Sequence, residues 1–139
     1  MNTIEEQVSK LSNLYHTILA QQGENAVMQN MQQAANDFMV SSNNELQNNL
    51  DDLSFEESAD LGKMISGYAF TLDTFRAIEK GEKNRGNIIN SMGLIKRSYK
   101  FYETKYIQEL EHRNKQQRED YINSILLPLM MMIDYLKKH

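Results

Sequence analysis

The sequence predicts an all-α bundle of four or five helices, with a long helix that starts near residue 88. Three observations lead to this fold class. The chain holds one proline, six glycines and nine methionines, a composition that leaves little for loops and hairpins and suits helices. No segment alternates apolar and polar residues for long enough to indicate a strand. Apolar residues recur every three or four positions along most of the chain, which is the spacing of packed helix faces.

The length and residue usage place the chain in a broad class. The 139 residues are enough for a single domain, 1–139, that buries a core without metal or disulfide support. There are no cysteines, which excludes disulfides, thiolate metal sites and cysteine nucleophiles. The N-terminus lacks the basic and apolar stretches of a signal peptide, and no apolar run is long enough to span a bilayer. We therefore expect a cytoplasmic protein without a membrane partner.

Helix starts are marked by the pattern Ser/Thr-x-x-Glu, in which the hydroxyl and the carboxylate each bind a free backbone N–H. It occurs three times, at Thr3–Glu6, Ser42–Glu45 and Ser54–Glu57. These sites predict a first helix, a short helix over 43–52 and a longer helix that begins after Ser54. Gly23 precedes a change of phase in the apolar spacing, so the first helix breaks near 22–25. Gly81 has the position of a left-handed cap that ends the helix from Ser54.

The most regular apolar spacing begins at Ile88. Residues 111–120 contain no apolar side chain, but Glu111 precedes Lys115 by four positions, and this order of charges supports a solvated helix. We therefore expect the helix to continue through solvent. A helix from 88 to 127 is about 60 Å long, which is longer than a typical bundle helix.

Residues 119–139 then form a projecting or dimerising C-terminal helix, which Pro128 kinks or breaks. Its part 121–136 is apolar on nearly every face, so it either folds back through a turn within 111–120 or docks on a second subunit. In the second case the self-association or partner surface is centred on Ile125, Leu126, Leu129, Met130 and Ile133. The alternative is that this segment is a central helix of the chain's own bundle.

Charge divides the chain into two unlike parts. Residues 1–62 contain one basic residue, Lys10, and ten acidic residues, a net charge of −9, whereas the remainder contains fourteen basic and nine acidic residues, a net charge of +5. Ten of the basic residues lie within 80–118. Such an asymmetry is satisfied either by contact between the two parts or by a partner of opposite sign.

A basic stripe within 80–118 is the candidate nucleic-acid site. If this region is one helix, five basic side chains share one side of it: Lys96, Arg97, Lys100, Lys115 and Arg118. Aromatic residues are interleaved with them, and basic groups with stacking rings are what a phosphate backbone and its bases require. The same pattern is also typical of a solvated helix face, and the pI of 5.4 is not that of a nucleic-acid-binding domain.

Motifs for chemistry are weak. Glu109 and His112 have the Glu-x-x-His spacing of di-iron bundles, but that site needs the motif twice and two further glutamates. His16 or His112 as a phosphoryl acceptor rests on one residue each, and no nucleophile stands beside a base. We therefore expect a non-enzymatic protein with no cofactor, no metal and no small-molecule substrate.

The function that follows is a helical interaction or regulatory protein that acts through protein–protein contacts and forms a homodimer. The alternative is a nucleic-acid-associated helical subunit that binds phosphate groups through the basic stripe.

Overall fold

The computed structural model describes residues 4–139, without the side chains of residues 4–8, 11 and 12. The capping box predicted at Thr3 lies outside the described residues. Within residues 4–139 the chain is helical almost throughout and contains no strand, which confirms the predicted all-α class.

The helices follow one another with short connections: α1 (Ile4–Gln22), α2 (Glu24–Asn48), α3 (Phe55–Glu79), α4 (Arg85–Gln108), a 3₁₀ turn (Leu110–His112), α5 (Lys115–Tyr121), a π turn (Ile122–Leu126) and α6 (Leu127–Lys138). The last three elements join without a loop. The described part of the chain therefore forms five helical rods, within the predicted number.

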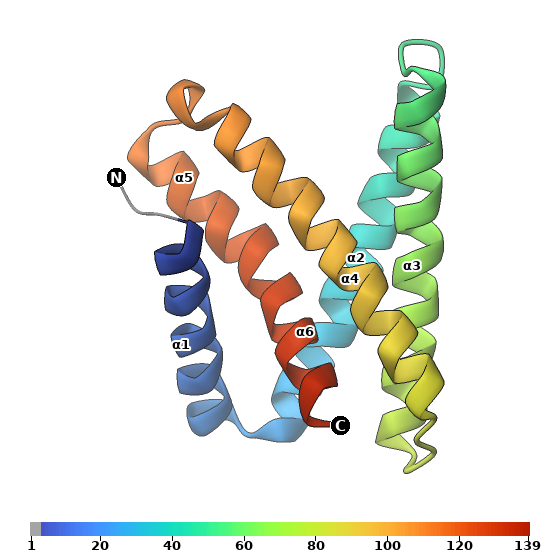
Figure 1. The fold of residues 1–139 in the computed structure, drawn as a ribbon, viewed down its shortest axis with the longest axis vertical. Helices are drawn as coiled ribbons and strands as arrows, with labels where there is room; N and C mark the ends of the chain where they lie inside the picture. Colours follow the sequence, from blue (N-terminus) through green and yellow to red (C-terminus); the bar gives the residue numbers. More distant parts are fainter. Residues whose placement is uncertain (1–3) are drawn as a thin grey trace.

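The rods form two groups that share α4 (Figure 1). Helices α2 and α3 form an antiparallel hairpin, α4 crosses this hairpin, and α6 lies between α4 and α1. The chain turns from α1 into α2 at Gly23, whose φ of 84° is in the left-handed region that favours glycine. The predicted break at this glycine is confirmed.

The two ends of α3 have the predicted chemistry. Ser54 accepts a hydrogen bond from the Glu57 backbone N–H, and the Glu57 carboxylate accepts one from the Ser54 N–H, both at 3.1 Å. At the other end Gly81 has a φ of 80°, and the Glu82 N–H donates to the Ala77 carbonyl at 2.8 Å. This backward bond satisfies a carbonyl that the helix itself leaves free.

The short helix predicted over 43–52 is wrong. Helix α2 continues unbroken to Asn48, and Ser42 lies in its interior as a buried residue. Met31, Ala35 and Ser42 are buried on the inner side of α2, which packs along α3, and this burial keeps the segment helical in spite of its start pattern.

The long helix through solvent is also wrong, because the chain folds back after α4. Arg113 has an extended backbone, with φ −115° and ψ 135°, and Asn114 caps α5 by accepting from the Gln117 N–H at 2.8 Å. The turn brings α5 alongside α4, where the Tyr121 hydroxyl donates to the Tyr102 carbonyl at 2.7 Å. Of the two outcomes that the sequence left open for the C-terminal segment, the fold-back is found.

The folded-back segment forms the centre of the core. Leu126, Leu129, Met130 and Ile133, four of the predicted self-association residues, are buried, and Ile125 is half-buried against the same cluster. Helix α6 does not project, because it packs on α1, α2 and α4. These contacts correspond to the alternative of a central helix in the chain's own bundle, and self-association itself stays a prediction.

Pro128 interrupts the α pattern without breaking the rod. The π turn before it places the Leu127 N–H on the Ile122 carbonyl, five residues back. Pro128 then falls in the first turn of α6, so its missing N–H coincides with the π turn, where the regular α pattern of bonds is already interrupted.

Truncating a side chain at the centre of this core tests how much the burial of α6 contributes to stability. Leu129 is 0% exposed, so Leu129→Ala should lower the free energy of unfolding by about 2–5 kcal/mol through lost burial and a residual cavity. Leu50, which is 60% exposed, is the matched control, and Leu50→Ala should change stability by less than about 0.5 kcal/mol. Urea unfolding followed by circular dichroism measures both. Equal small changes would contradict the core position of α6.

The buried tyrosines predict how the fold responds to alkali. Burial raises the pKa of six tyrosine hydroxyls above the ordinary value of 10. The pKa of Tyr135 rises to about 12, and the other five tyrosines are Tyr15, Tyr68, Tyr99, Tyr102 and Tyr121. Because the folded state favours the neutral phenol, stability is fully present below pH 10 and is lost as the pH rises toward the raised values.

This loss of stability in alkali can be checked by recording tyrosinate absorbance and helicity together as the pH is raised. We expect these hydroxyls to ionise above pH 10 and in step with the loss of helix, whereas the urea-unfolded chain titrates near 10. Ionisation of all the tyrosines near pH 10 with the helix intact would refute it.

Candidate functional site

An open groove of about 640 Å³ lies between α4 and the α2–α3 hairpin. Figure 1 shows that the two diverge toward the tip of the hairpin, while α4 leans toward α5 and α6. The side chains that line the groove come from α2, α3, α4 and Glu109, the residue that follows α4. Three of them are apolar, Met64, Leu94 and Phe101, and we call these the groove floor.

Helices α3 and α4 are joined at the narrow end of the groove. The buried Gly67 of α3 lies close to Leu94 of α4: a Cβ atom added at Gly67 would be 3.4 Å from the Leu94 Cβ, an ordinary van der Waals contact. Beside it the Tyr68 hydroxyl is hydrogen-bonded to Ser98, which also lines the groove. Burial is the main cause of the raised pKa of Tyr68, so this hydroxyl stays neutral and can donate. The contact fixes the crossing point of the two helices.

The hairpin contributes an acidic wall, made by Glu45 from α2 and by Glu57 and Asp60 from α3. The capping box holds the Glu57 carboxylate at the start of α3. The free backbone N–H groups of the first turn of α3 also favour negative charge, so Glu57 stabilises the helix in addition to lining the groove.

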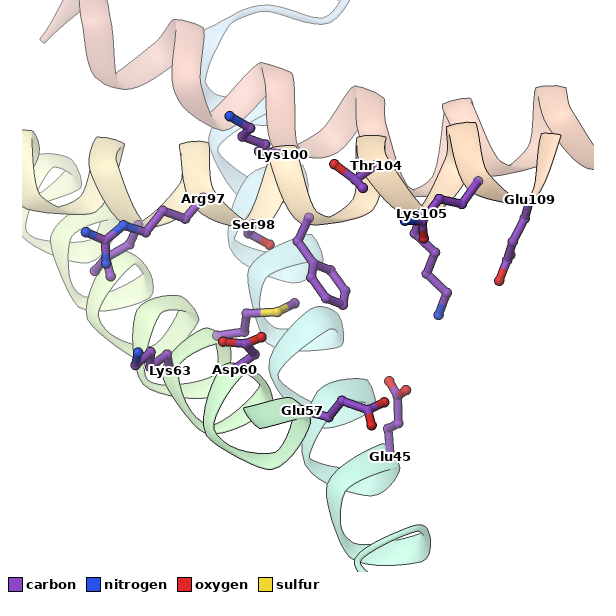
Figure 2. A pocket seen from close by; sticks show the side chains of 14 residues that line it. Glu45, Glu57, Asp60, Lys63, Arg97, Ser98, Lys100, Thr104, Lys105 and Glu109 are labelled. Atoms are coloured by element: carbon purple, nitrogen blue, oxygen red, sulfur yellow. The ribbon is translucent and has the colours of Figure 1, made fainter. Parts of the chain in front are cut away.

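Helix α4 contributes a basic wall, made by Arg97 and Lys105. Figure 2 shows Lys105 pointing from α4 into the groove, with Glu45 and Glu57 on the opposite side. Lys63 adds one positive charge from α3, whereas Lys100, at the rim, points away from the hairpin.

The charges of the two walls face each other without direct contact. Arg76 pairs with Asp73, Arg113 with Glu109 and His139 with Glu24 within 4 Å, and none of these pairs joins the hairpin to α4. At the groove the acidic and basic parts of the chain thus lie side by side, but contact between their charges does not satisfy the asymmetry there, because these charges remain open to solvent.

The end of α4 is held in place by the turn that follows it, and Glu109, the residue after α4, adds an acid to this side of the groove. The Arg113 guanidinium is paired with Glu109 and lies 4.4 Å from the centre of the Tyr121 ring. The hydrogen bond from Arg113 lowers the pKa of the Glu109 carboxyl, so this acid is charged at neutral pH. Arg118 donates two hydrogen bonds, of 3.0 and 2.6 Å, to the Leu110 carbonyl.

The predicted basic stripe is divided between two helices. Lys96, Arg97 and Lys100 are exposed on α4, Lys115 is exposed on α5, and Arg118 is half-buried in its contact with Leu110. The single face that the sequence predicted depended on one continuous helix and is therefore wrong. Arg97 belongs to the groove together with acids of the hairpin, which disfavours a phosphate backbone at this place.

Sequence reasoning missed the groove floor and its acidic wall. Phe101 is one of the aromatic residues interleaved with the basic ones, and it lies off the buried face of α4 that Tyr99 and Tyr106 mark. An aromatic residue on the polar side of an amphipathic helix is a signal for a binding surface that a sequence can carry.

The weak motifs gain no second metal-ligating group in the described residues. Glu109 is paired with Arg113, and His112 is exposed. Among the side chains that the structure describes there is no group of three or more His, Asp or Glu residues placed to hold a metal ion. None of the described helices is both long and apolar enough to cross a membrane.

Comparison with known proteins adds no relative: no protein-family model, curated protein or solved structure matches this chain. The case for the groove rests on its geometry and charges.

Arg118 and Lys115 allow a direct test of structural against surface roles on one helix. Arg118→Gln should lower the free energy of unfolding by about 1–2 kcal/mol, because charge-assisted hydrogen bonds to a half-buried carbonyl are lost. Lys115→Gln should change it by less than about 0.5 kcal/mol. Urea midpoints measure both. Equal effects would show that the Leu110 contact does not hold the end of α4.

Proposed function

We propose that the protein is a non-catalytic protein-binding module, and that the groove between α4 and the α2–α3 hairpin receives a segment of a partner protein. The observation that carries the proposal is the groove floor of Met64, Leu94 and Phe101 between two walls of opposite charge that make no ion pair with each other. An apolar floor supplies affinity on burial, and flanking charges supply specificity.

The exposure of aromatic residues supports the same conclusion. Phe101 is 39% exposed within the groove, and Phe55 is 89% exposed at the tip of the hairpin that forms one side of it. Burying a phenylalanine that is left in water contributes roughly 1.5–3 kcal/mol. A partner that covers both rings therefore gains affinity that the free protein forgoes.

The chemistry of the lining favours a protein segment over the other classes. A nucleic-acid backbone is uniformly negative and would lie against the carboxylates of Glu45, Glu57 and Asp60. The salt dependence of binding separates this alternative, because phosphate contacts give a steep loss of affinity with salt.

Self-association is not part of this proposal. It was predicted from the apolar residues 121–136, and most of these side chains are covered by the chain's own helices. Light scattering of the purified protein over a range of concentrations tests it separately.

A photo-crosslinking amino acid at position 101 tests the function. In living cells, this position should give a protein adduct that resists nuclease, and mass spectrometry should identify the same partner segment in repeated experiments. The matched control is position 89, because Ile89 is 54% exposed on the same helix but lies outside the groove. We expect no specific adduct from position 89.

Three results would contradict the proposal: no adduct from position 101, equal adducts from both positions, or an adduct that nuclease removes. The last result would favour the nucleic-acid alternative. Replacing Lys96, Arg97 and Lys100 together by Gln should then abolish the adduct while leaving the helix content unchanged.

A further inference from the structure

We infer that the occupant of the groove is an amphipathic helix of a partner protein, with an apolar stripe flanked by one basic edge and one acidic edge. This inference rests on the proposed function and specifies the kind of segment that the groove binds.

The dimensions of the groove fit a short helix. Its lining on α4 runs from Leu94 to Gln108, a length of about 21 Å, which corresponds to roughly four helical turns. A helix of four turns with a narrow apolar stripe, two residues in every seven, presents about four apolar side chains along one face. The groove floor offers three apolar contacts, Met64, Leu94 and Phe101. Docking an apolar helix face into such a groove is a common way in which helical proteins bind partners.

The charges of the walls determine the edges of that helix. The side formed by the hairpin presents Glu45, Glu57 and Asp60, so the edge of the ligand on that side is basic. The side formed by α4 presents Arg97, Lys105 and, at the rim, Lys100, against the acid Glu109 just after the helix, so this side is basic on balance and the opposite edge of the ligand is acidic. Figure 2 shows the clearest part of this arrangement, where Lys105 and Glu45 project into the groove from opposite sides.

The same arrangement rejects ligands of a single sign. A helix with two acidic edges meets the carboxylates of the hairpin, and a helix with two basic edges meets Arg97 and Lys105. Like charges brought together at an interface oppose binding, which is how a surface discriminates against wrong partners. Because the two walls differ in sign, they also set the direction in which the ligand helix lies along the groove.

Three synthetic helical peptides test this inference with the intact protein. All carry the same apolar stripe, and they differ only in their edges: one acidic and one basic, both acidic, or both basic. Fluorescence anisotropy of labelled peptide gives each Kd at low salt. We expect the mixed peptide to bind at least about tenfold more tightly than either single-sign peptide, and a mixed peptide with serine in place of the stripe to bind far more weakly.

Charge reversal of one wall should change the preference in a defined way. With Arg97→Glu and Lys105→Glu, both walls are acidic, and the peptide with two basic edges should bind best. With Glu45→Lys and Asp60→Lys, the walls become predominantly basic, and the peptide with two acidic edges should bind best. Glu57 is left unchanged because it caps α3. Circular dichroism confirms that each variant is folded.

The matched control for the first reversal is Lys96→Glu with Lys115→Glu, which makes the same change of net charge at exposed positions outside the groove. This variant should keep the preference for the mixed peptide. Equal binding of the three peptides, no binding of any, or a preference that changes with the control as much as with the groove variant would overturn the inference.

The two proposals fail in distinguishable ways. If position 101 gives a specific protein adduct but the peptides show no preference, the groove binds a protein segment that is not a helix with edges of opposite charge, and this inference alone is wrong. If position 101 gives no adduct, the proposed function is wrong as well.

Discussion

Helix α6 is apolar on nearly every face, so water cannot solvate it and the other helices must cover it. Helices α1, α2 and α4 do so. Each fully buried side chain of this helix contributes roughly 1.5–3 kcal/mol, whereas an exposed ion pair contributes about 0–1 kcal/mol. Helix α4 crosses α3 at the contact between Tyr68 and Ser98, and its C-terminal half is placed by its contacts with α5 and α6 and not by the acidic side chains of the hairpin. Its C-terminal half leans away from the hairpin in consequence, and the groove is the space that this leaves (Figure 1).

The parts of the fold that were predicted correctly depend on local chemistry. The capping box at Ser54, the break at Gly23 and the cap at Gly81 each involve neighbouring residues, so the sequence contains the whole interaction. The fold-back after α4 depends on contacts between distant residues, such as Tyr121 with Tyr102 and Arg118 with Leu110. A run of polar residues with helical charge spacing cannot reveal such contacts. Ser42 shows the reverse case, in which burial overrides a local start pattern.

The candidate site was harder to predict than the fold for the same reason. The opposed charges of the two parts of the chain were visible in the sequence, and they do lie side by side. What the sequence could not show is that packing keeps the two walls apart, because this depends on the angle between α4 and the hairpin. Charges that would otherwise neutralise each other thus remain available to a ligand. A groove of this kind is built from side chains that the core does not use, such as Phe101, Lys105 and Glu45.

The most direct test of this account measures the width of the groove in the free protein. Because the chain has no cysteine, spin labels can be attached cleanly at Asn48→Cys, at the end of α2, and Gln108→Cys, at the end of α4. Pulsed electron paramagnetic resonance then gives the distribution of distances between the two spin labels, across the groove, at low and at high salt. The account predicts one narrow distribution that salt does not change, since packing and not charge fixes α4. A shorter distance at low salt that disappears at high salt would show that the walls pair with each other, and would contradict it.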